Sequence, residues 1–271
     1  MSSSLTPPLV ASGPELTDEQ RVRYARHLVT PALGEEGQRR LLGARVAVLG
    51  TGGLGSPVLT YLVAAGVGHI TIIDDDVVEL SNLNRQVLHD TWSLGTPKVD
   101  SAARRLSALN PDVELTVHRV RLTDDNADHL LGGHHLVVDC ADNFPTRYVI
   151  ADACERLGVP HVWAALLHTQ GQLSVFTRRR ADADGPVAGV GLRDVFPTPP
   201  RPEDLPPGPV GILGPLCGQV GSMVATEAIK MITGMGRPLI GRVAFVDVLA
   251  PSVREVAVRP APDAVPGTVT T

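Results

Sequence analysis

The stretch that decides the fold is Arg45-Val46-Ala47-Val48-Leu49-Gly50-Thr51-Gly52-Gly53-Leu54-Gly55. Its four apolar residues 46–49 predict a buried strand, and the Gly50-x-Gly52-x-x-Gly55 spacing before an apolar run predicts a tight turn into a helix. Glycines let the backbone approach phosphate oxygens, and the helix N-terminus offers free N–H groups and a positive dipole end. The stretch therefore predicts a phosphate-binding turn, but it does not by itself distinguish NAD from ATP.

After this stretch, predicted strands alternate with predicted helices along the chain. Short apolar runs predict strands, and helical periodicity predicts the helices between them. The alternating strands are expected at 46–49, 70–73, 113–117, 136–139 and 161–165, and the helices at 54–65, 98–109, after Thr123, and at 147–157. We expect an α/β fold, a Rossmann-like mostly parallel sheet with helices on both faces. Antiparallel strands at 172–177, 243–248 and 253–258 would extend this sheet at its C-terminal end.

Helix-start signals refine two of the expected helices. Thr17 and Gln20 have capping-box spacing, and apolar residues at helical period follow them as far as Pro31. Thr96 as N-cap and Pro97 in the first turn would open the helix at 98–109. A long apolar helix is expected at 212–232.

The two ends and one internal loop are predicted to be irregular. Residues 1–15 are rich in Ser and Pro and are expected to form a disordered leader, and 259–271 a tail. Residues 16–258 would form one domain. Its segment 178–210 begins with three successive arginines and is rich in proline, so it cannot form regular hydrogen bonds. We expect this loop to cover the functional site.

Composition limits the classes of protein. The 271 residues carry a formal net charge of -5 without a basic run, so neither nucleic acid nor an anionic membrane is an expected partner. The three cysteines, Cys140, Cys154 and Cys217, are odd in number and far apart, unlike a disulfide framework or a metal knuckle. The N-terminus lacks the features of a signal peptide, and no apolar run is long enough to span a bilayer. A cytoplasmic protein is expected.

An acidic residue follows the second predicted strand. Asp74 lies roughly twenty residues past the glycine loop, where an acid commonly accepts hydrogen bonds from ribose hydroxyls. Its neighbours Asp75 and Asp76 are expected to be solvated or turn-forming.

Two cations and a further acid favour one class of nucleotide chemistry. Arg85 can fork onto phosphate oxygens, and Lys98, in the first turn of a helix, can act as a point charge on the same phosphate. Asp142 follows the strand at 136–139, at the edge where open α/β sheets bind ligands. Attack on an α-phosphate builds negative charge there and on the departing pyrophosphate, which requires fixed cations and a magnesium-binding carboxylate. A nicotinamide enzyme would not need this set, so a nucleotidyl-transfer site is favoured.

Together with further motifs, these residues resemble the ThiF/MoeB/HesA family, the bacterial relatives of ubiquitin-activating enzymes. The resemblance covers about residues 16–258 and is nearest to the adenylating domain of MoeZ-type members. The motifs that carry it are, in chain order, Arg23-Tyr24-Ala25-Arg26, Gly50–Gly55, Ser81-Asn82-Leu83-Asn84-Arg85-Gln86, Gly95-Thr96-Pro97-Lys98, Asp139-Cys140-Ala141-Asp142-Asn143, Gly171-Gln172 and Glu227-Ala228-Ile229-Lys230.

The resemblance implies an enzyme that uses ATP and Mg²⁺ to adenylate the C-terminal glycine of a small ubiquitin-like sulfur-carrier protein or peptide ending in Gly-Gly. It also implies a homodimer in which Arg26 reaches the other subunit's site. Asp74 would hold the ribose, and Asp142 would bind magnesium. The implied nucleotide-binding residues are Gly50, Gly52, Gly53, Asp74, Ser81, Asn82, Leu83, Asn84, Arg85, Lys98, Asp142 and Asn143, and the implied catalytic residues are Arg26, Arg85, Lys98 and Asp142.

Two features of many family members are missing from the sequence. Val187–Val190 stands where members carry the first of two zinc-binding Cys-x-x-Cys motifs, and the C-terminal tail has no cysteine, so zinc is not expected. Pro207 stands where relatives can carry a cysteine that accepts an acyl group or a persulfide. The acyl-adenylate is therefore expected to react without a cysteine thioester in this loop. Cys140 and Cys217 are expected to be packed and poorly reactive.

Two other functions remain open from the sequence alone. The glycine loop would also suit an NAD(P)-dependent oxidoreductase. The missing loop cysteine would also suit a non-catalytic scaffold that keeps the fold and binds a carrier. His89 and His168 lie near the inferred pocket, but adenylation needs no strong base because the attacking carboxylate is already ionised at neutral pH.

Overall fold

A sheet of eight strands in the order β10-β9-β6-β5-β4-β1-β2-β3 forms the centre of the protein. The computed structural model describes residues 6–177, 180–182, 185–187, 189–201, 203 and 210–260, with residues 180–182 and 185–187 described by backbone alone. The strands of this sheet are β1 (Arg45–Leu49), β2 (His69–Ile73), β3 (Glu114–His118), β4 (Leu136–Asp139), β5 (His161–Leu167), β6 (Gln170–Phe176), β9 (Arg242–Asp247) and β10 (Ser252–Ala257). Strands β3, β2, β1, β4 and β5 are parallel, whereas β6, β9 and β10 are antiparallel. The predicted fold class is confirmed.

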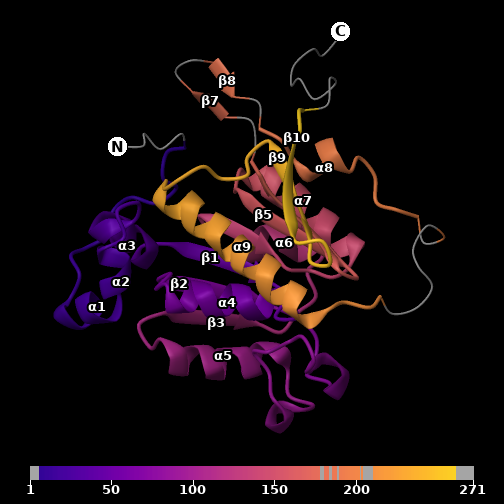
Figure 1. Cartoon of the computed structure of the whole chain (residues 1–271), viewed down its shortest axis with the longest axis horizontal. Helices are drawn as coiled ribbons and strands as arrows, with labels where there is room; N and C mark the ends of the chain where they lie inside the picture. The colour runs from indigo at the N-terminus through magenta and orange to yellow at the C-terminus, as the bar shows by residue number, and fades with distance from the viewer. Residues whose placement is uncertain are drawn as a thin grey trace.

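The helices cover both faces of this sheet (Figure 1). They are α1 (Asp18–Arg23), α2 (Ala25–Leu28), α3 (Gly34–Leu42), α4 (Gly55–Ala64), α5 (Lys98–Leu109), α6 (Asp124–Leu131), α7 (Phe144–Leu157), α8 (Leu192–Val195) and α9 (Gly214–Thr233), with 3-10 turns η1 (Leu80–Asn82) and η2 (Thr91–Ser93). Successive strand residues point to opposite faces, so Val46 and Val48 join the core under α4, α5 and α9, whereas Ala47 and Leu49 join the core under α6 and α7. The alternation explains why β1 is apolar throughout.

Helix α9 is the longest described element and packs on the sheet. Its residues Leu216, Val220, Val224 and Ala228 are fully buried and recur every four positions, as one face of a helix requires. Among the described residues, no helix is long and apolar enough to cross a membrane.

The N-terminal segment is ordered where a disordered leader was expected. That prediction for residues 1–15 is wrong from Thr6 onward, and residues 1–5 lie outside the described part. Val10 is buried in the core, and the Leu9 amide donates to the Met231 carbonyl of α9 at 3.1 Å. The Arg39 guanidinium donates to the Gly13 carbonyl. The Ser/Pro composition did not reveal that Leu9 and Val10 pack on the core or that the backbone of this segment makes hydrogen bonds.

The capping box at Thr17 is confirmed, but the helix that follows it is broken. The Gln20 amide donates to Thr17 Oγ1 and the Thr17 amide donates to Gln20 Oε1, both at 3.2 Å. The chain then interrupts the helix at Tyr24, whose buried hydroxyl accepts a hydrogen bond from Asn110 Nδ2. This tertiary contact leaves the apolar Val22 and Val29 exposed.

Two further predictions need correction. Thr96 does not cap α5, because Pro97 occupies the N-cap position without a side-chain hydrogen bond. The loop 178–210 does form regular structure, since β7 (Arg180–Asp182) pairs with β8 (Gly185–Val187) and α8 follows them. Residues 178–179, 183–184, 188, 202, 204–209 and 261–271 lie outside the described residues, and they include Pro207 and most of the predicted tail.

Candidate active site

The glycine loop joins the carboxyl end of β1 to α4, as predicted. Gly50 has a φ of 91°, and a Cβ at this position would lie 2.8 Å from the Cys140 carbonyl oxygen. A Cβ at Gly55 would lie 2.0 Å from the Gly50 carbonyl oxygen. Both positions therefore require glycine for backbone reasons. No side chain caps the N-terminus of α4, so it is suited to an anion.

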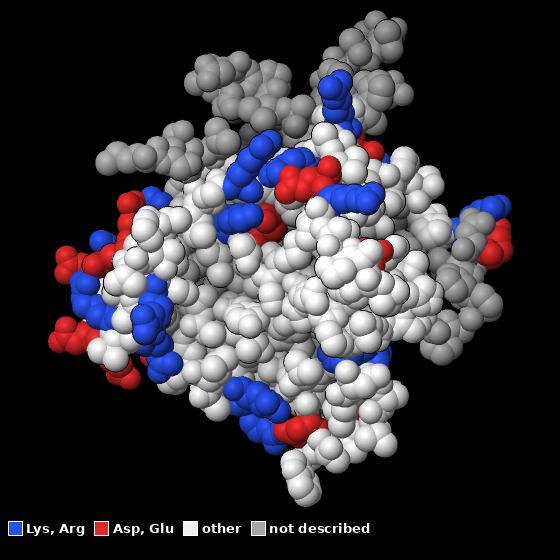
Figure 2. Space-filling model, viewed as in Figure 1, with Lys and Arg blue, Asp and Glu red and all other residues white. Residues whose placement is uncertain are grey.

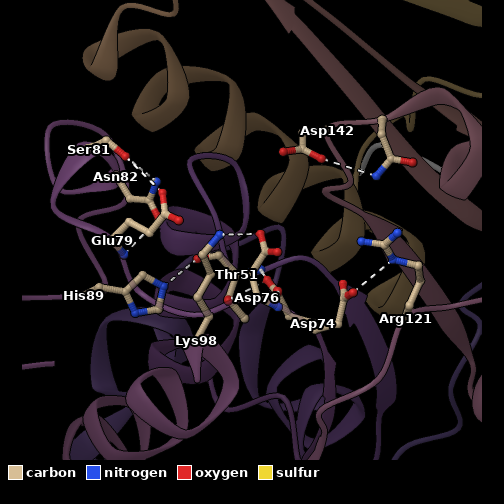
Figure 3. Close-up of polar contacts among 12 residues, drawn as sticks. Thr51, Asp74, Asp76, Glu79, Ser81, Asn82, His89, Lys98, Arg121 and Asp142 are labelled. Atoms are coloured by element: carbon tan, nitrogen blue, oxygen red, sulfur yellow. Dashed lines mark hydrogen bonds and ion pairs between the residues drawn. The ribbon is translucent and has the colours of Figure 1, made fainter. Parts of the chain in front are cut away.

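Asp74 is held against the glycine loop. Its Oδ2 accepts hydrogen bonds from the Thr51 amide at 2.7 Å and from Thr51 Oγ1 at 2.8 Å, and its Oδ1 accepts from the Asp76 amide at 2.9 Å (Figure 3). An ionised carboxylate offers about four lone-pair positions, so capacity remains for a ribose hydroxyl. The sequence singled out Asp74 but missed Thr51, whose place inside the loop was the available signal.

A buried histidine supports Thr51 from the other side. His89 Nε2 lies 3.0 Å from the Thr51 carbonyl oxygen and Nδ1 lies 3.0 Å from Ser101 Oγ. A carbonyl only accepts, so Nε2 carries the proton and Nδ1 is free to accept from the serine hydroxyl. Burial lowers the pKa of His89, and the charge of Lys98 lowers it further, against the opposing effect of the Thr51 carbonyl.

Lys98 is paired rather than free. Its Nζ lies 2.8 Å from Asp76 Oδ2, and its side chain is only 7% exposed, whereas that of Asp76 is 57% exposed. The expectation that Asp76 is merely solvated or turn-forming is wrong, because Asp76 holds this ammonium beside Asp74 (Figure 3). Asp75 is paired as well, with Arg121.

The segment Ser81–Gln86 forms η1 and the turn after it. Asn82 is buried and completes the turn, since its Oδ1 accepts from the Glu79 amide and its Nδ2 donates to Ser81 Oγ. Arg85 Nη1 donates to the Ser81 carbonyl and to Asn84 Oδ1, both at 3.1 Å. Leu83 is half-buried beside them.

The start of α9 packs against this turn and against the glycine loop. A Cβ at Gly214 would lie 2.5 Å from the Asn84 carbonyl oxygen. A Cβ at Gly53 would lie 2.8 Å from Cys217 Sγ and 3.7 Å from Arg85 Cγ, and one at Gly52 would lie 3.4 Å from Gln86 Nε2. Burial raises the pKa of Cys217, although the charge of Arg85 opposes this, and burial raises that of Cys140 more strongly. Both thiols are packed, as expected.

Asp142 and Asn143 follow β4. Asp142 is exposed, and among the described residues its hydrogen bond comes from Asn143 Nδ2 at 3.3 Å. Asn143 caps α7 by accepting from the Thr146 amide at 3.0 Å, a structural role that the sequence analysis missed. The buried Arg147 fixes this loop by donating to the Ala141 carbonyl. Figure 3 shows Asp142 across from Asp74, Asp76 and Lys98.

The predicted catalytic residues fall into two groups. Arg85, Lys98 and Asp142 all lie at the carboxyl edge of the parallel strands, yet in the described part of the chain no hydrogen bond or ion pair joins them to one another. Arg26 is exposed on α2, which packs beside α3, and α3 leads directly into the amino end of β1. Arg26 and Arg85 therefore lie at opposite edges of the sheet.

A model of the ThiF family matches residues 24–266, which is most of the chain. The chain belongs to the ThiF family. It is 45% identical over 263 residues to a Mycobacterium tuberculosis protein named "Probable adenylyltransferase/sulfurtransferase MoeZ", covering 97% of this chain and 66% of that protein. This chain thus spans slightly less than two thirds of the length of that relative.

Two relatives match over most of their own length. The "Sulfur carrier protein adenylyltransferase" of Thermus thermophilus is 46% identical, with 90% of this chain and 89% of that protein covered. The "SAMP-activating enzyme E1" of Haloferax volcanii is 43% identical, with 89% and 86% covered. Among solved structures, Escherichia coli MccB matches with a TM-score of 0.77 at 20% identity, over 89% of this chain and 73% of MccB, which supports the fold alone. The predicted family is confirmed.

Proposed function

We propose that this chain is an adenylyltransferase that uses ATP to activate the C-terminal glycine carboxylate of a small ubiquitin-like sulfur-carrier protein or peptide ending in Gly-Gly. The supporting observation is one sheet edge that combines the Thr51–Asp74 contact, the glycine loop, Arg85 and Lys98. The names of three relatives support the same activity, and two of them name a sulfur carrier or a SAMP as the protein acted on.

In this proposal the ionised carboxylate of the carrier attacks the α-phosphate. A new bond forms between a carboxylate oxygen and the α-phosphorus, the bond to the bridging oxygen breaks, and pyrophosphate leaves with its electron pair. Negative charge grows on the transferred group and on pyrophosphate. Arg85 would contact these oxygens in a forked manner, while Lys98, which is almost fully buried and is held by Asp76, would act as a point charge on the same phosphate.

Asp142 is the proposed magnesium ligand. Magnesium is bound by hard oxygen ligands and usually by one or two carboxylates plus substrate phosphates. The exposed Asp142 carboxylate fits this requirement, since its hydrogen bond within the described residues is a long one from its neighbour. Bound magnesium would supply Lewis-acid stabilisation of phosphate charge. No zinc is proposed, because the four thiolates of such a site are missing from the sequence.

The acyl-adenylate would react onward without a cysteine thioester in the loop before α9. Pro207 stands at the position of the cysteine that relatives can carry, although it lies outside the described residues. Two cysteines lie near the site, and both are buried, Cys217 against Gly53 and Cys140 against Gly50. A sulfide donor or another protein would therefore attack the carbonyl carbon of the mixed anhydride directly, and the bond from this carbon to the phosphate oxygen would break with release of AMP. The loop 178–210 would cover the carrier tail.

A homodimer is part of the proposal. Five-residue strands separate the two ends of the parallel strands by about 16 Å, so Arg26 would serve the site of the other subunit rather than that of its own. Figure 2 shows that the face over α4 and α9 is almost free of charged side chains, as the core of a subunit interface commonly is. A second copy on this face would bring Arg26 toward the other subunit's site.

ATP–pyrophosphate exchange with carriers ending in Gly-Gly tests the proposal. We expect carrier-dependent exchange in the wild type and a loss of about a hundredfold or more in Arg85→Ala, because a cation on the developing charge is removed. Arg104→Ala is the matched control, since Arg104 is an exposed cation on α5. Absence of exchange with every carrier, together with tighter binding of NADH than of ATP·Mg, would contradict the proposal. Unchanged carrier binding without exchange would indicate a scaffold instead.

A further inference from the structure

Arg121 is a basic residue at the same sheet edge that the activity proposed above does not use. It follows β3 by three residues, and the end of β3 is joined to the end of β2 because the Asp74 amide donates to the His118 carbonyl. The backbone of Arg121 is fixed at the start of α6, where Asn126 Nδ2 donates to its carbonyl at 2.9 Å. The backbone of Arg121 is therefore held in a fixed place near Asp74.

One nitrogen of the Arg121 guanidinium is held in place. Its Nε donates to Asp75 Oδ2 at 2.9 Å, while the side chain of Arg121 is 73% exposed and that of Asp75 is 39% exposed. An ion pair as exposed as this contributes little to stability. The contact does orient the guanidinium, and Figure 3 shows it on the side of Asp74 away from Lys98.

Arg121 lies where we expect the base of a nucleotide bound at this edge of the sheet. In the proposed function the phosphates lie by Lys98 and the glycine loop, and the ribose lies at Asp74. The base and the phosphates leave a ribose at opposite ends, from C1′ and C5′. A nucleotide bound in this way would extend its base from Asp74 toward the side on which Arg121 lies (Figure 3).

We propose that Arg121 stacks its guanidinium on the purine ring of the bound nucleotide, with Asp75 as the residue that positions it. A planar guanidinium stacks on aromatic rings, whereas a lysine ammonium does not reproduce this contact. The inference rests on the proposed function and adds a base-binding residue to it. Because Arg121 and Asp75 are exposed, replacing either should leave the fold intact.

Direct binding of ATP and of inorganic tripolyphosphate, measured by calorimetry on the full chain, tests the inference. Arg121→Ala should weaken ATP binding about threefold to fivefold and leave tripolyphosphate binding unchanged, because only ATP carries a base. Arg121→Lys should recover only part of this loss, because a lysine ammonium cannot stack as a planar guanidinium does. As a single substitution, Asp75→Ala should weaken ATP binding. When it is added to Arg121→Ala, it should weaken binding no further. Arg119→Ala is the matched control, since Arg119 lies on the same loop and pairs with Asp100 at 2.5 Å.

The outcomes separate this inference from the proposed function. ATP binding equal to wild type in Arg121→Ala would overturn the inference while leaving adenylation untouched. Equal losses for ATP and tripolyphosphate would also overturn it, because Arg121 would then contact phosphate. Full affinity in Arg121→Lys would do the same, since charge alone would suffice. A wild type that binds no ATP would overturn the proposed function and, with it, the ligand assumed for Arg121.

Discussion

His89 links the glycine loop to α5 through hydrogen bonds on both ring nitrogens. It fixes the Thr51 carbonyl, and the amide and hydroxyl of Thr51 in turn hold Asp74. Sequence reasoning found Asp74 from its place after a strand, but it did not predict the contact of His89 with Thr51 or the pairing of Asp76 with Lys98. Both contacts depend on distances between segments far apart in the chain, and residue type does not determine those distances.

The lowered pKa of His89 predicts a pH dependence of stability. Because the folded state disfavours the protonated ring, the unfolded chain binds more protons near pH 6.5, the ordinary pKa of histidine. This contribution to the free energy of unfolding is complete above that pH and is lost as the pH falls. We expect the midpoint of thermal unfolding to fall less steeply from about pH 7.5 to about pH 5.5 in His89→Gln than in the wild type. His134→Gln should show a separate effect, since burial also lowers the pKa of His134. An unchanged slope in His89→Gln would refute the role given to burial.

At the scale of elements, apolar runs predicted the strands of the central sheet to within a few residues. The β5–β6 antiparallel pair followed from the change in pattern near Gly171. The prediction failed where composition conflicted with tertiary contacts. The segment with Val10 is Ser/Pro-rich but docks on α3 and α9, and the segment 178–210 contains a hairpin and α8 despite its prolines. Neither set of contacts produces a periodic pattern of apolar residues in the sequence.

Because α9 packs against the glycine loop, substitutions at Gly53 in the loop and at Cys217 in α9 should have coupled effects on stability. A Cβ at Gly53 would approach Cys217 Sγ to 2.8 Å, so Gly53→Ala should displace the loop and destabilise the fold by about 1–3 kcal/mol. Cys217→Ala removes this sulfur, so the double variant should regain most of the loss in stability and in ATP affinity. Gly218→Ala is the control, because nothing lies within 4 Å of a Cβ there, and it should stabilise α9 by about 0.5–1 kcal/mol. Additive effects of the two site substitutions would show that Cys217 does not restrict Gly53.

At the scale of the whole molecule, the separation of Arg26 from Arg85 predicts complementation between subunits. In a symmetric dimer, each site would take Arg85 from one subunit and Arg26 from the other. Arg26→Ala and Arg85→Ala should each abolish ATP–pyrophosphate exchange. When the two variants are mixed and allowed to exchange subunits, half of the dimers are mixed and each of these has one intact site. About a quarter of the wild-type activity should therefore return.

A second mixture makes this test specific. In the proposed site Arg85 and Lys98 come from the same subunit, so mixing Arg85→Ala with Lys98→Ala would leave every site defective and should restore no exchange. Recovery in the first mixture but not in the second requires that Arg26 acts across the interface, because a general stabilising effect of mixing would appear in both. Full activity of Arg26→Ala alone would remove Arg26 from the site. Failure of both mixtures, with subunit exchange shown independently, would contradict the action of Arg26 across the interface.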